Sequence, residues 1–257
     1  MDTTPRYHLI DAIRGLTIIS MVLYHSCYDY FIIFNNDYSF IRNSGCYYWQ
    51  QSICITFNLI SGFVWFFGRK HALKNGLIIN LFGLIITIIS VIFIPSEAIY
   101  FGVLTFLGSA MIIMLPVNAL IQKLCPDGIS KSQALIGVII NIALFAIFRH
   151  LPNGYCGTFR TRFFNFPSIM YKSKLLIPFG FPTDSFVSSD YFPLLPWLFM
   201  YLTGYFLAKL LPQNQKLANI CTIKIPFLSY IGKKSLLIYL LHQPLCFGIT
   251  WLLSVIL

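Results

Sequence analysis

The feature that most constrains this chain is a series of seven apolar segments, each near the ~20 residues that an α-helix needs to cross a bilayer. They are Leu9–Phe34, Trp49–Phe67, Gly76–Ile94, Ile99–Ile121, Ser132–Phe148, Tyr191–Leu211 and Leu228–Leu257. The last exceeds one span, so its first turn, LSYIGKK, is expected at the interface. Only 10% of the residues are charged, against about 25% in soluble domains. The sequence therefore predicts an all-α polytopic membrane protein of seven helices, forming one domain over residues 1–257.

Lysine and arginine set the predicted orientation, because cytoplasmic loops carry an excess of them. With the N-terminus inside, the inner side receives Arg6, Arg69, Lys70, Lys74, Lys123, Lys131, Lys209, Lys216, Lys224, Lys233 and Lys234. The outer side receives Arg42, Arg149, Arg160, Arg162, Lys172 and Lys174. This excess predicts that the N-terminus is inside and the C-terminus outside. The net charge of +10 then reflects helix ends that meet anionic lipid headgroups, and it does not indicate a nucleic-acid partner.

One loop on the predicted outer side, Arg149–Ser189, is long, and such loops are usually functional or disordered. Its aromatic content argues against disorder, so we expect it to fold back over the outer mouth; the residues are Phe159, Phe163, Phe164, Phe166 and Tyr171. The seven cysteines show no CxxC pair and no Cys/His metal spacing. We therefore predict no metal site, while a disulfide between Cys46 and Cys156 is left open.

Four ionisable side chains lie in the first segment: Asp11, Arg14, His25 and Asp29. At 100° per residue they project within a stripe roughly 60° wide. They cannot face lipid, since each would cost roughly 2.5–3.5 kcal/mol at the bilayer centre. Asp11 and Arg14 either form a simple ion pair at a helix end or present Arg14 to a phosphate. His25, about 16 Å further along, is either a hydrogen-bonded core residue or a base that Asp29 orients.

The second segment has its own polar line, which lies within about 80°: Gln51, Cys54, Asn58, Ser61 and Trp65. The pair Ser61-Gly62 either lets helices approach closely or contacts a ligand. At the inner end, Arg69, Lys70 and His71 either anchor the helix or bind phosphates.

The last segment places polar residues on one face within about 60°: Ser235, Tyr239, His242 and Cys246. Pro244 removes one backbone hydrogen bond and frees a carbonyl near position 240. His242 and Gln243 precede this kink, as a hydrogen-bond node or as the lining of a substrate cavity. Asp190, which opens the sixth segment, is either the N-cap of that helix or a site residue.

Several stretches resemble the bacterial members of the heparan-alpha-glucosaminide N-acetyltransferase catalytic-domain family: IDAIRGLTIISMVLYH, FNLISGF, GVLTFLGSAMIIMLP, DYFPLLPWLFMYLTGYFLAKLL and LSYIGKKSLLIYLLHQPL. More distantly they resemble the wider superfamily of membrane-bound sugar acyltransferases. The match touches six of the seven segments and keeps their order. The chain departs from the family's pattern in two places. The loop Asn35–Tyr48 lacks the working histidine of the lysosomal enzyme, and Ser52 stands where the wider superfamily has an arginine.

The resemblance implies acyl transfer from cytoplasmic acyl-CoA, often acetyl-CoA, to an extracytoplasmic sugar hydroxyl or amine. His25 would be the base or the group that takes the acyl, assisted by Asp29. The expected donor-binding residues are Arg14, Asn58, Ser61, Arg69 and Lys70. The expected substrate-binding residues are Tyr239, His242, Gln243 and Asp190. The acceptor would be a glycan or a lipid-linked sugar, no metal would take part, and a homodimer in a bacterial plasma membrane is left open.

Two other functions fit the same residues. One is a non-enzymatic carrier or flippase for a lipid-linked sugar or an organic anion, in which the charged stripe lines a translocation path. The other is a structural membrane protein whose buried charges only pair helices.

Overall fold

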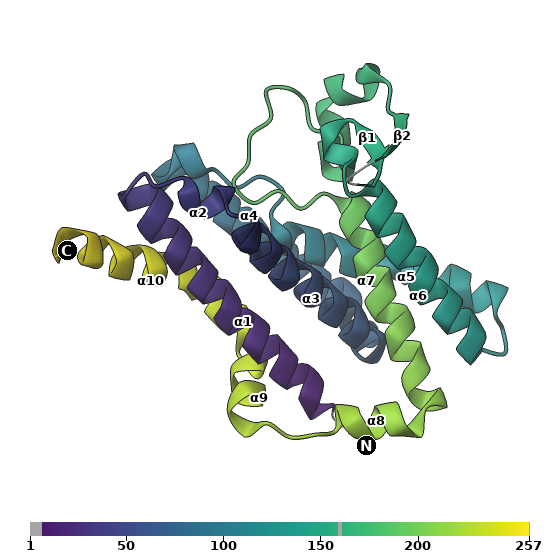
Figure 1. Ribbon diagram of the computed structural model, residues 1–257. Coiled ribbons are helices and arrows are strands. Elements are labelled where there is room, and N and C mark those ends of the chain that lie inside the picture. Colours follow the sequence, from purple (N-terminus) through teal and green to yellow (C-terminus); the bar gives the residue numbers. More distant parts are fainter. Residues whose placement is uncertain (1–6, 159–160, 257) are drawn as a thin grey trace. The chain divides into compact units, whose positions relative to one another are not determined.

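A computed structural model describes residues 7–158 and 161–256, and these are almost entirely helical (Figure 1). Within them, six continuous helical stretches are long and apolar enough to cross a membrane. One of these, Ser44–Phe93, has 50 residues and contains two of the predicted segments, α3 (Ser44–Gly68) and α4 (Ala72–Phe93). The other five segments correspond to α1 (His8–Tyr28), α5 (Val103–Leu124), α6 (Lys131–Phe148), α7 (Leu194–Leu210) and α10 (Ser235–Ile256). The predicted all-α polytopic architecture is confirmed. Arg6, Phe159 and Arg160, named above, lie outside the described residues.

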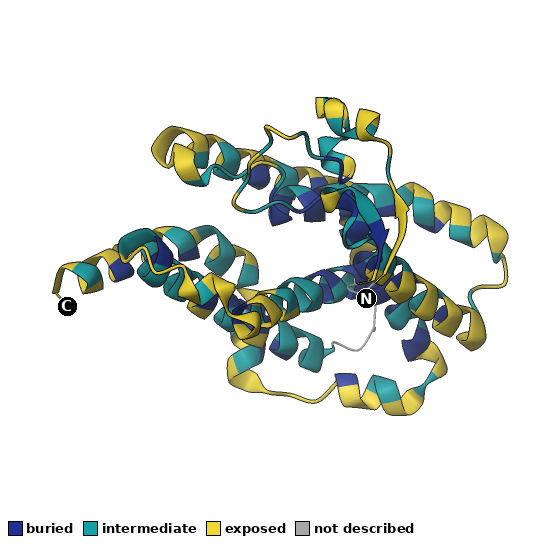
Figure 2. Ribbon diagram, turned by 45° about the horizontal axis from the view of Figure 1, so that its top comes forward, coloured by how far each residue is buried: buried dark blue, intermediate teal, exposed yellow. Residues whose placement is uncertain are grey.

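The surface of the helices is suited to lipid. α4 exposes an aliphatic stripe at helical spacing: Leu77, Leu81, Leu84, Ile88 and Ile92. Figure 2 shows exposed residues along the lengths of the helices and not only at their ends. Large exposed apolar surfaces of this kind are rare on soluble monomers, whereas in a bilayer they cost nothing. The protein is therefore an integral, multi-pass membrane protein.

The chain divides into two compact units, which are described separately below. The first comprises residues 1–60 and 214–257, and the second comprises residues 61–213. α3 contributes its first part to the first unit and its last residues to the second. The expectation of one domain concerns how these units pack together, and it stays a prediction.

In the first unit, α1 packs closely against α9 (Pro226–Lys233), and the two helices lie side by side in Figure 1. Glycine makes this possible. A Cβ atom at Gly15 would collide with the carbonyl oxygen of Leu228, and one at Gly232 would collide with the carbonyl oxygen of Asp11. Because the obstacles are backbone atoms, no rotation of a side chain could relieve these collisions. The helices approach through the small residues that serve this purpose in membranes.

The first helix changes its winding at Asp29. Residues Asp29–Phe34 form a π-helix, and the N–H group of Asn35 donates to the carbonyl of Tyr30, five residues earlier. Before this segment, α1 is joined to α3 by a hydrogen bond of 2.8 Å from the indole N–H of Trp49 to the hydroxyl of Ser20. Short π-helical segments are rare and often occur at functional sites.

The predicted long last segment is two helices. α9 ends at Lys233 and α10 begins at Ser235, and of the two only α10 is long and apolar enough to span a membrane. The short helix α8 (Gln215–Cys221) precedes them, capped by the side chain of Asn214. The turn LSYIGKK thus lies in α9 and its C-cap residue Lys234, and its place at the interface stays a prediction.

In the second unit, α4 packs on α5, and α6 packs on α7, as Figure 1 shows. The end of α3 meets α7 at Gly62, where a Cβ atom would collide with the carbonyl oxygen of Tyr201. The indole N–H of Trp65 donates to the carbonyl of Met111 at 3.0 Å, and the hydroxyl of Tyr205 donates to Asn118 at 2.7 Å. For Ser61-Gly62, the packing alternative therefore has direct structural support.

The long loop has structure of its own, as its aromatic content predicts. It contains the antiparallel strands β1 (Tyr155–Gly157) and β2 (Arg162–Asn165), followed by two short 3-10 helices, Ser168–Lys172 and Lys174–Phe179. Its end is joined to the segment before α5 by backbone hydrogen bonds from Ser189 to Ala98 and from Phe192 to Phe101. Cys156 in β1 and Cys46 in α3 belong to different units, so the disulfide between them stays open.

Candidate functional site

Seven of the eleven predicted site residues belong to the first unit: Arg14, His25, Asp29, Asn58, Tyr239, His242 and Gln243. They come from α1, α3, α10 and the π-helical segment. Sequence positions more than 200 residues apart are thus brought to one group of helices, and their contacts can be followed residue by residue.

At the start of α1, the guanidinium of Arg14 pairs with the carboxylate of Asp11 at 3.4 Å. The side chains are 20% and 13% exposed, respectively. The predicted pairing is confirmed, and the partial exposure leaves part of the guanidinium accessible. Whether Arg14 binds a phosphate stays a prediction.

Further along α1, His25 meets His242 of α10. The centroids of the two imidazole rings are 4.9 Å apart, with the ring planes at 61°. His25 also lies edge-on to the ring of Tyr24, at 5.8 Å. The helical stripe predicted that His25 faces inward, and its partner is the histidine that the last segment places on its own polar face.

The proton positions of His242 follow from its surroundings. Its Nδ1 lies 2.6 Å from the carbonyl oxygen of Tyr239, which can only accept a hydrogen bond. Nδ1 therefore carries the proton, and Nε2 carries a lone pair. His242 is 7% exposed, and among the described residues nothing forms a hydrogen bond with its Nε2. A buried acceptor without a partner is costly, which makes it a good position for a ligand's proton.

Asp29 has a hydrogen-bond partner that the sequence did not indicate. It is fully buried, and its carboxylate accepts hydrogen bonds from the side-chain amide of Gln243, at 3.1 and 3.4 Å. Within the described part of the chain, His25 forms no hydrogen bond with Asp29. The carboxylate therefore positions the residue next to His242, and whether it assists His25 stays a prediction.

Asn58 provides a second buried acceptor in the first unit. Its side chain is fully buried, and its amide N–H donates to the carbonyl of Cys54, at 2.8 Å. The amide oxygen Oδ1 has no hydrogen-bond partner among the described residues. Nearby on the same helix, the ring of Phe57 lies 6.4 Å from that of Tyr239 in α10.

The other four predicted residues, Ser61, Arg69, Lys70 and Asp190, belong to the second unit. Arg69 and Lys70 are exposed, in the 3-10 turn between α3 and α4. The guanidinium of Arg69 donates to the carbonyl of Phe66 and lies 4.8 Å from the centre of the Phe66 ring.

Sequence reasoning missed a contribution from Lys209. It was counted only as one inner-side lysine at the end of the sixth segment. In the structure, its ammonium lies 4.0 Å from the centre of the Phe66 ring, which Arg69 also contacts. Two positive charges therefore lie over one aromatic ring, each attracted by its π face. The signal in the sequence is weak, because it needs the contact between α7 and the end of α3.

Asp190 caps a helix, but not the predicted one. α7 begins at Leu194 after Pro193, whereas the Asp190 carboxylate accepts the N–H of Val103 at 3.1 Å, at the start of α5. The sequence suggested the nearer helix because cap residues usually precede their own helix. Here the carboxylate satisfies a free N–H group of a helix 87 residues earlier.

Replacing Asp190 should change how stability depends on pH. Burial raises the pKa of the Asp190 carboxyl from its ordinary value of 3.8 to about 6, and the hydrogen bond from Val103 opposes this rise. Because the folded pKa is the higher one, the folded protein holds the proton more tightly. Asp190 should therefore lower the free energy of unfolding as the pH rises from about 4 to about 6.

The check is thermal unfolding of the wild type and Asp190→Asn in detergent at pH 4 to 7. Asparagine can still accept the N–H of Val103 but does not ionise, so the variant should gain stability relative to the wild type as the pH rises. A difference between the two proteins that stays constant across this range would contradict the raised pKa.

No group of three or more His, Cys, Asp or Glu side chains in residues 7–158 and 161–256 is placed to hold a metal ion.

Comparison with known proteins gives one match. No curated protein and no solved structure matches the chain. A model of one protein family, described as "Heparan-alpha-glucosaminide N-acetyltransferase, catalytic", matches residues 6–244, which is most of the 257 residues and includes every predicted site residue. The name of this family implies acetyl transfer in a membrane, with acetyl-CoA and a glycan as substrates. The chain therefore belongs to the heparan-alpha-glucosaminide N-acetyltransferase catalytic-domain family.

Proposed function

We propose that this protein transfers an acetyl group from cytoplasmic acetyl-CoA to a hydroxyl or an amine of an extracytoplasmic glycan or lipid-linked sugar. Its location would be a bacterial plasma membrane, with the N-terminus inside. The observation that carries the proposal is the imidazole pair of His25 and His242, in which His242 keeps a buried, unpartnered Nε2. Acyl transfer to a hydroxyl needs such a proton acceptor, and membrane helices rarely bury one without use.

The proposed step is direct transfer. The acceptor's oxygen or nitrogen attacks the thioester carbonyl, while its proton moves to an imidazole of the pair. The C–S bond then breaks, and the thiolate of CoA leaves and takes up a proton. His25 is one candidate for the base. His242 is the second, because the carbonyl of Tyr239 fixes its tautomer with the lone pair on Nε2.

Neighbouring residues support the pair in this proposal. Gln243, held by Asp29, sets the position of α10 next to His242. The free amide oxygen of Asn58 would accept a hydrogen bond from a substrate N–H or O–H group. Tyr239 and Asp190 are proposed on the acceptor side. No metal is proposed, and a homodimer stays a prediction.

The donor phosphates are assigned to cations at the predicted inner side. The Arg14 side chain is 20% exposed beside Asp11. In the second unit, Arg69 and Lys209 both lie over the ring of Phe66, and Lys70 follows Arg69 in the turn after α3. Guanidinium groups bind phosphate through paired hydrogen bonds, and lysines add charge. Ser61 is proposed in the path of the acyl group.

The assignment of the phosphates predicts a loss of affinity without a loss of chemistry. Arg14→Gln and Arg69→Gln should each raise the dissociation constant of acetyl-CoA about tenfold, which is the loss expected for one charged hydrogen bond. Lys74→Gln, exposed on α4, is a matched control that should leave the constant unchanged. Binding can be measured by thermal shift, since a ligand that binds only the folded form raises the unfolding temperature. Unchanged affinity in both arginine variants would remove the donor-phosphate assignment.

The enzyme itself can be tested in detergent with labelled acetyl-CoA. Without an acceptor, the wild type should hydrolyse acetyl-CoA slowly, with water attacking in place of the sugar, and His25→Ala should abolish this while acetyl-CoA still binds. A carrier for a lipid-linked sugar would do neither. Absence of both turnover and acetyl-CoA binding in the folded wild type would reject the proposal in favour of that alternative.

A further inference from the structure

We propose that a pocket in the second unit holds the headgroup of a membrane phospholipid that carries both a phosphate and an ammonium group. The pocket lies between the segment Pro95–Tyr100 and the loop segment Lys174–Val187, and its volume is about 450 Å³. Ligand pockets usually measure about 300–1,000 Å³. The residues that line it are different from the proposed acyl-transfer residues, so the inference adds a lipid site and does not depend on acyl transfer.

The pocket lies where membrane helices end. One wall is the connection between α4, which ends at Phe93, and α5, which begins at Val103. The predicted topology puts this connection and the long loop on the same, outer side. Both walls continue into exposed apolar side chains: Phe93 is 75% exposed, and Leu175, directly after Lys174, is 83% exposed. Acyl chains would cover these side chains, whereas a ligand dissolved in water would leave them exposed.

The walls of the pocket are fixed before a ligand arrives. The hydroxyl of Ser188 accepts the N–H of Tyr100 at 2.9 Å and donates to the carbonyl of the same residue at 3.0 Å. The ring of Phe186 lies 6.3 Å from that of Tyr100 and 5.0 Å from that of Tyr191. The hydroxyl of Tyr191 in turn donates to the carbonyl of Ile177. A site ordered in this way does not lose much conformational entropy when it binds.

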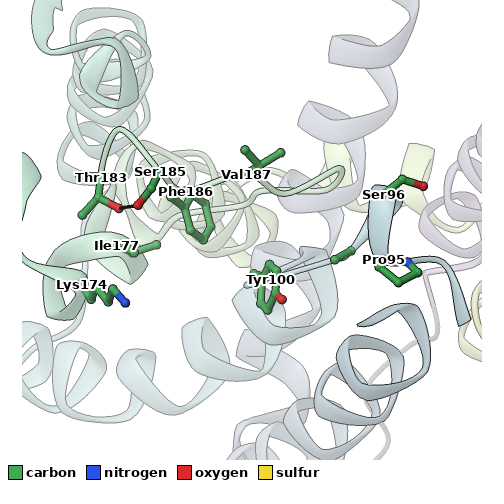
Figure 3. A pocket seen from close by; sticks show the side chains of 10 residues that line it. Pro95, Ser96, Tyr100, Lys174, Ile177, Thr183, Ser185, Phe186 and Val187 are labelled. Atoms are coloured by element: carbon green, nitrogen blue, oxygen red, sulfur yellow. Dashed lines mark hydrogen bonds between the residues drawn. The ribbon is translucent and has the colours of Figure 1, made fainter. Parts of the chain in front are cut away.

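The polar groups of the lining suit a phosphate. Lys174, Thr183 and Ser185 lie on the same side of the pocket in the view of Figure 3. The hydroxyls of Thr183 and Ser185 are 3.5 Å apart. An ammonium group and hydroxyls can all donate to phosphate oxygens. A lysine at the end of a membrane helix also has an apolar stem long enough to bring its ammonium to the headgroups.

Carboxylates and aromatic rings next to these donors suit an ammonium. Asp184, which is exposed, and Glu97 are each flanked in sequence by two lining residues. The carboxylate of Glu97 accepts a hydrogen bond from the hydroxyl of Ser189, at 2.8 Å. The rings of Tyr100 and Phe186 belong to the lining, and their faces attract a cation. One lysine and two carboxylates match a zwitterionic headgroup and disfavour a headgroup that is only anionic.

The test is lipid binding to the full chain in mixed micelles of an uncharged detergent, without acetyl-CoA. The probes are phosphatidylethanolamine and phosphatidylglycerol with identical acyl chains, and glycerophosphoethanolamine, which has the first headgroup and no chains. Binding is read from the rise in the unfolding temperature. The wild type should bind phosphatidylethanolamine most tightly, phosphatidylglycerol less tightly and glycerophosphoethanolamine most weakly.

Variants of the charged residues separate the two halves of the headgroup. Lys174→Gln should weaken the binding of both lipids about tenfold, because both carry the phosphate. Lys172→Gln, exposed in the same loop but outside the lining, is the matched control and should bind both lipids as the wild type does. Asp184→Asn should weaken phosphatidylethanolamine alone, by about threefold, as expected for an exposed charge pair. Its control is Asp127→Asn, exposed in the connection between α5 and α6.

A further variant tests the place of binding. Ser96 is exposed and lines the pocket, so Ser96→Trp should fill the pocket without disturbing the fold and reduce the binding of both lipids. Equal binding of the two lipids, equal effects of the two lysine variants, or full binding by Ser96→Trp would each overturn the inference. Glycerophosphoethanolamine that binds as tightly as the lipid would overturn it as well. Since none of these measurements uses acetyl-CoA, the proposed acyl transfer can stand or fail independently.

Discussion

His25→Gln and His242→Gln should each lower acetyl transfer by about 10²–10⁴-fold, the range that a positioned general base contributes. The reason is geometric: the rings are 4.9 Å apart, and Nε2 of His242 is a buried acceptor without a hydrogen-bond partner among the described residues. Glutamine keeps much of the volume and can still donate a hydrogen bond, but it cannot take the proton. The measurement is the single-turnover rate of acetyl transfer at saturating acetyl-CoA.

The double variant makes this prediction specific to a pair that acts together. Residues that act as a unit are not additive, so the double variant should be about as slow as the slower single variant. His8→Gln is the control, because only the main-chain carbonyl of His8 has a described contact, with the hydroxyl of Ser229. A rate within twofold of the wild type in either single variant would remove that histidine from the proton step. Fully multiplicative losses would show that the two act independently.

The largest effect on stability is expected at the contact of α1 with α9. Gly15→Ala and Gly232→Ala should each lower the free energy of unfolding by about 3 kcal/mol or more, because the added Cβ meets backbone atoms that no rotamer change can move. The measurement is denaturation in detergent or a mixed micelle. If either variant does not fold, a loss of folded protein after purification shows the same destabilisation.

Gly248→Ala is the matched control for this prediction. Gly248 lies in α10, and no atom lies within 4 Å of the position that a Cβ would take there. The substitution should be neutral or stabilise by up to about 1 kcal/mol, since alanine is the better helix former. Equal stability of Gly15→Ala and Gly248→Ala would mean that α1 and α9 are further apart than described here.

Much of the fold could be predicted from the sequence, because length and apolarity alone identify helices that cross a membrane. The same rules could not separate α9 from α10, because both are apolar and no proline marks the break at Lys234. They also placed the starts of α5 and α7 three to four residues early. Pro193 and the irregular segment before Val103 delay those helices.

The sequence predicted which face of each helix carries the candidate site residues, but not which of these residues contact one another. Helical spacing turned His25 and His242 inward on their own helices, but no pattern indicates that the two rings meet. The same spacing put Asp29 near His25, whereas its hydrogen bonds go to Gln243, 214 residues away. The helix that Asp190 caps was wrongly predicted for the same reason. Its partner Val103 is distant in sequence, and only the tertiary contact reveals it.

The winding of the first membrane helix governs which changes of length it can tolerate. A π-helical turn has room for one residue more than the α-helical path it replaces. Deleting one residue within Tyr30–Phe34 would let this stretch relax to ordinary α-helix and leave everything before it in register. Deleting one residue between Arg14 and His25 would instead rotate one against the other by about 100°. Natural insertions and deletions in relatives should therefore collect after Asp29 and avoid the stretch before it.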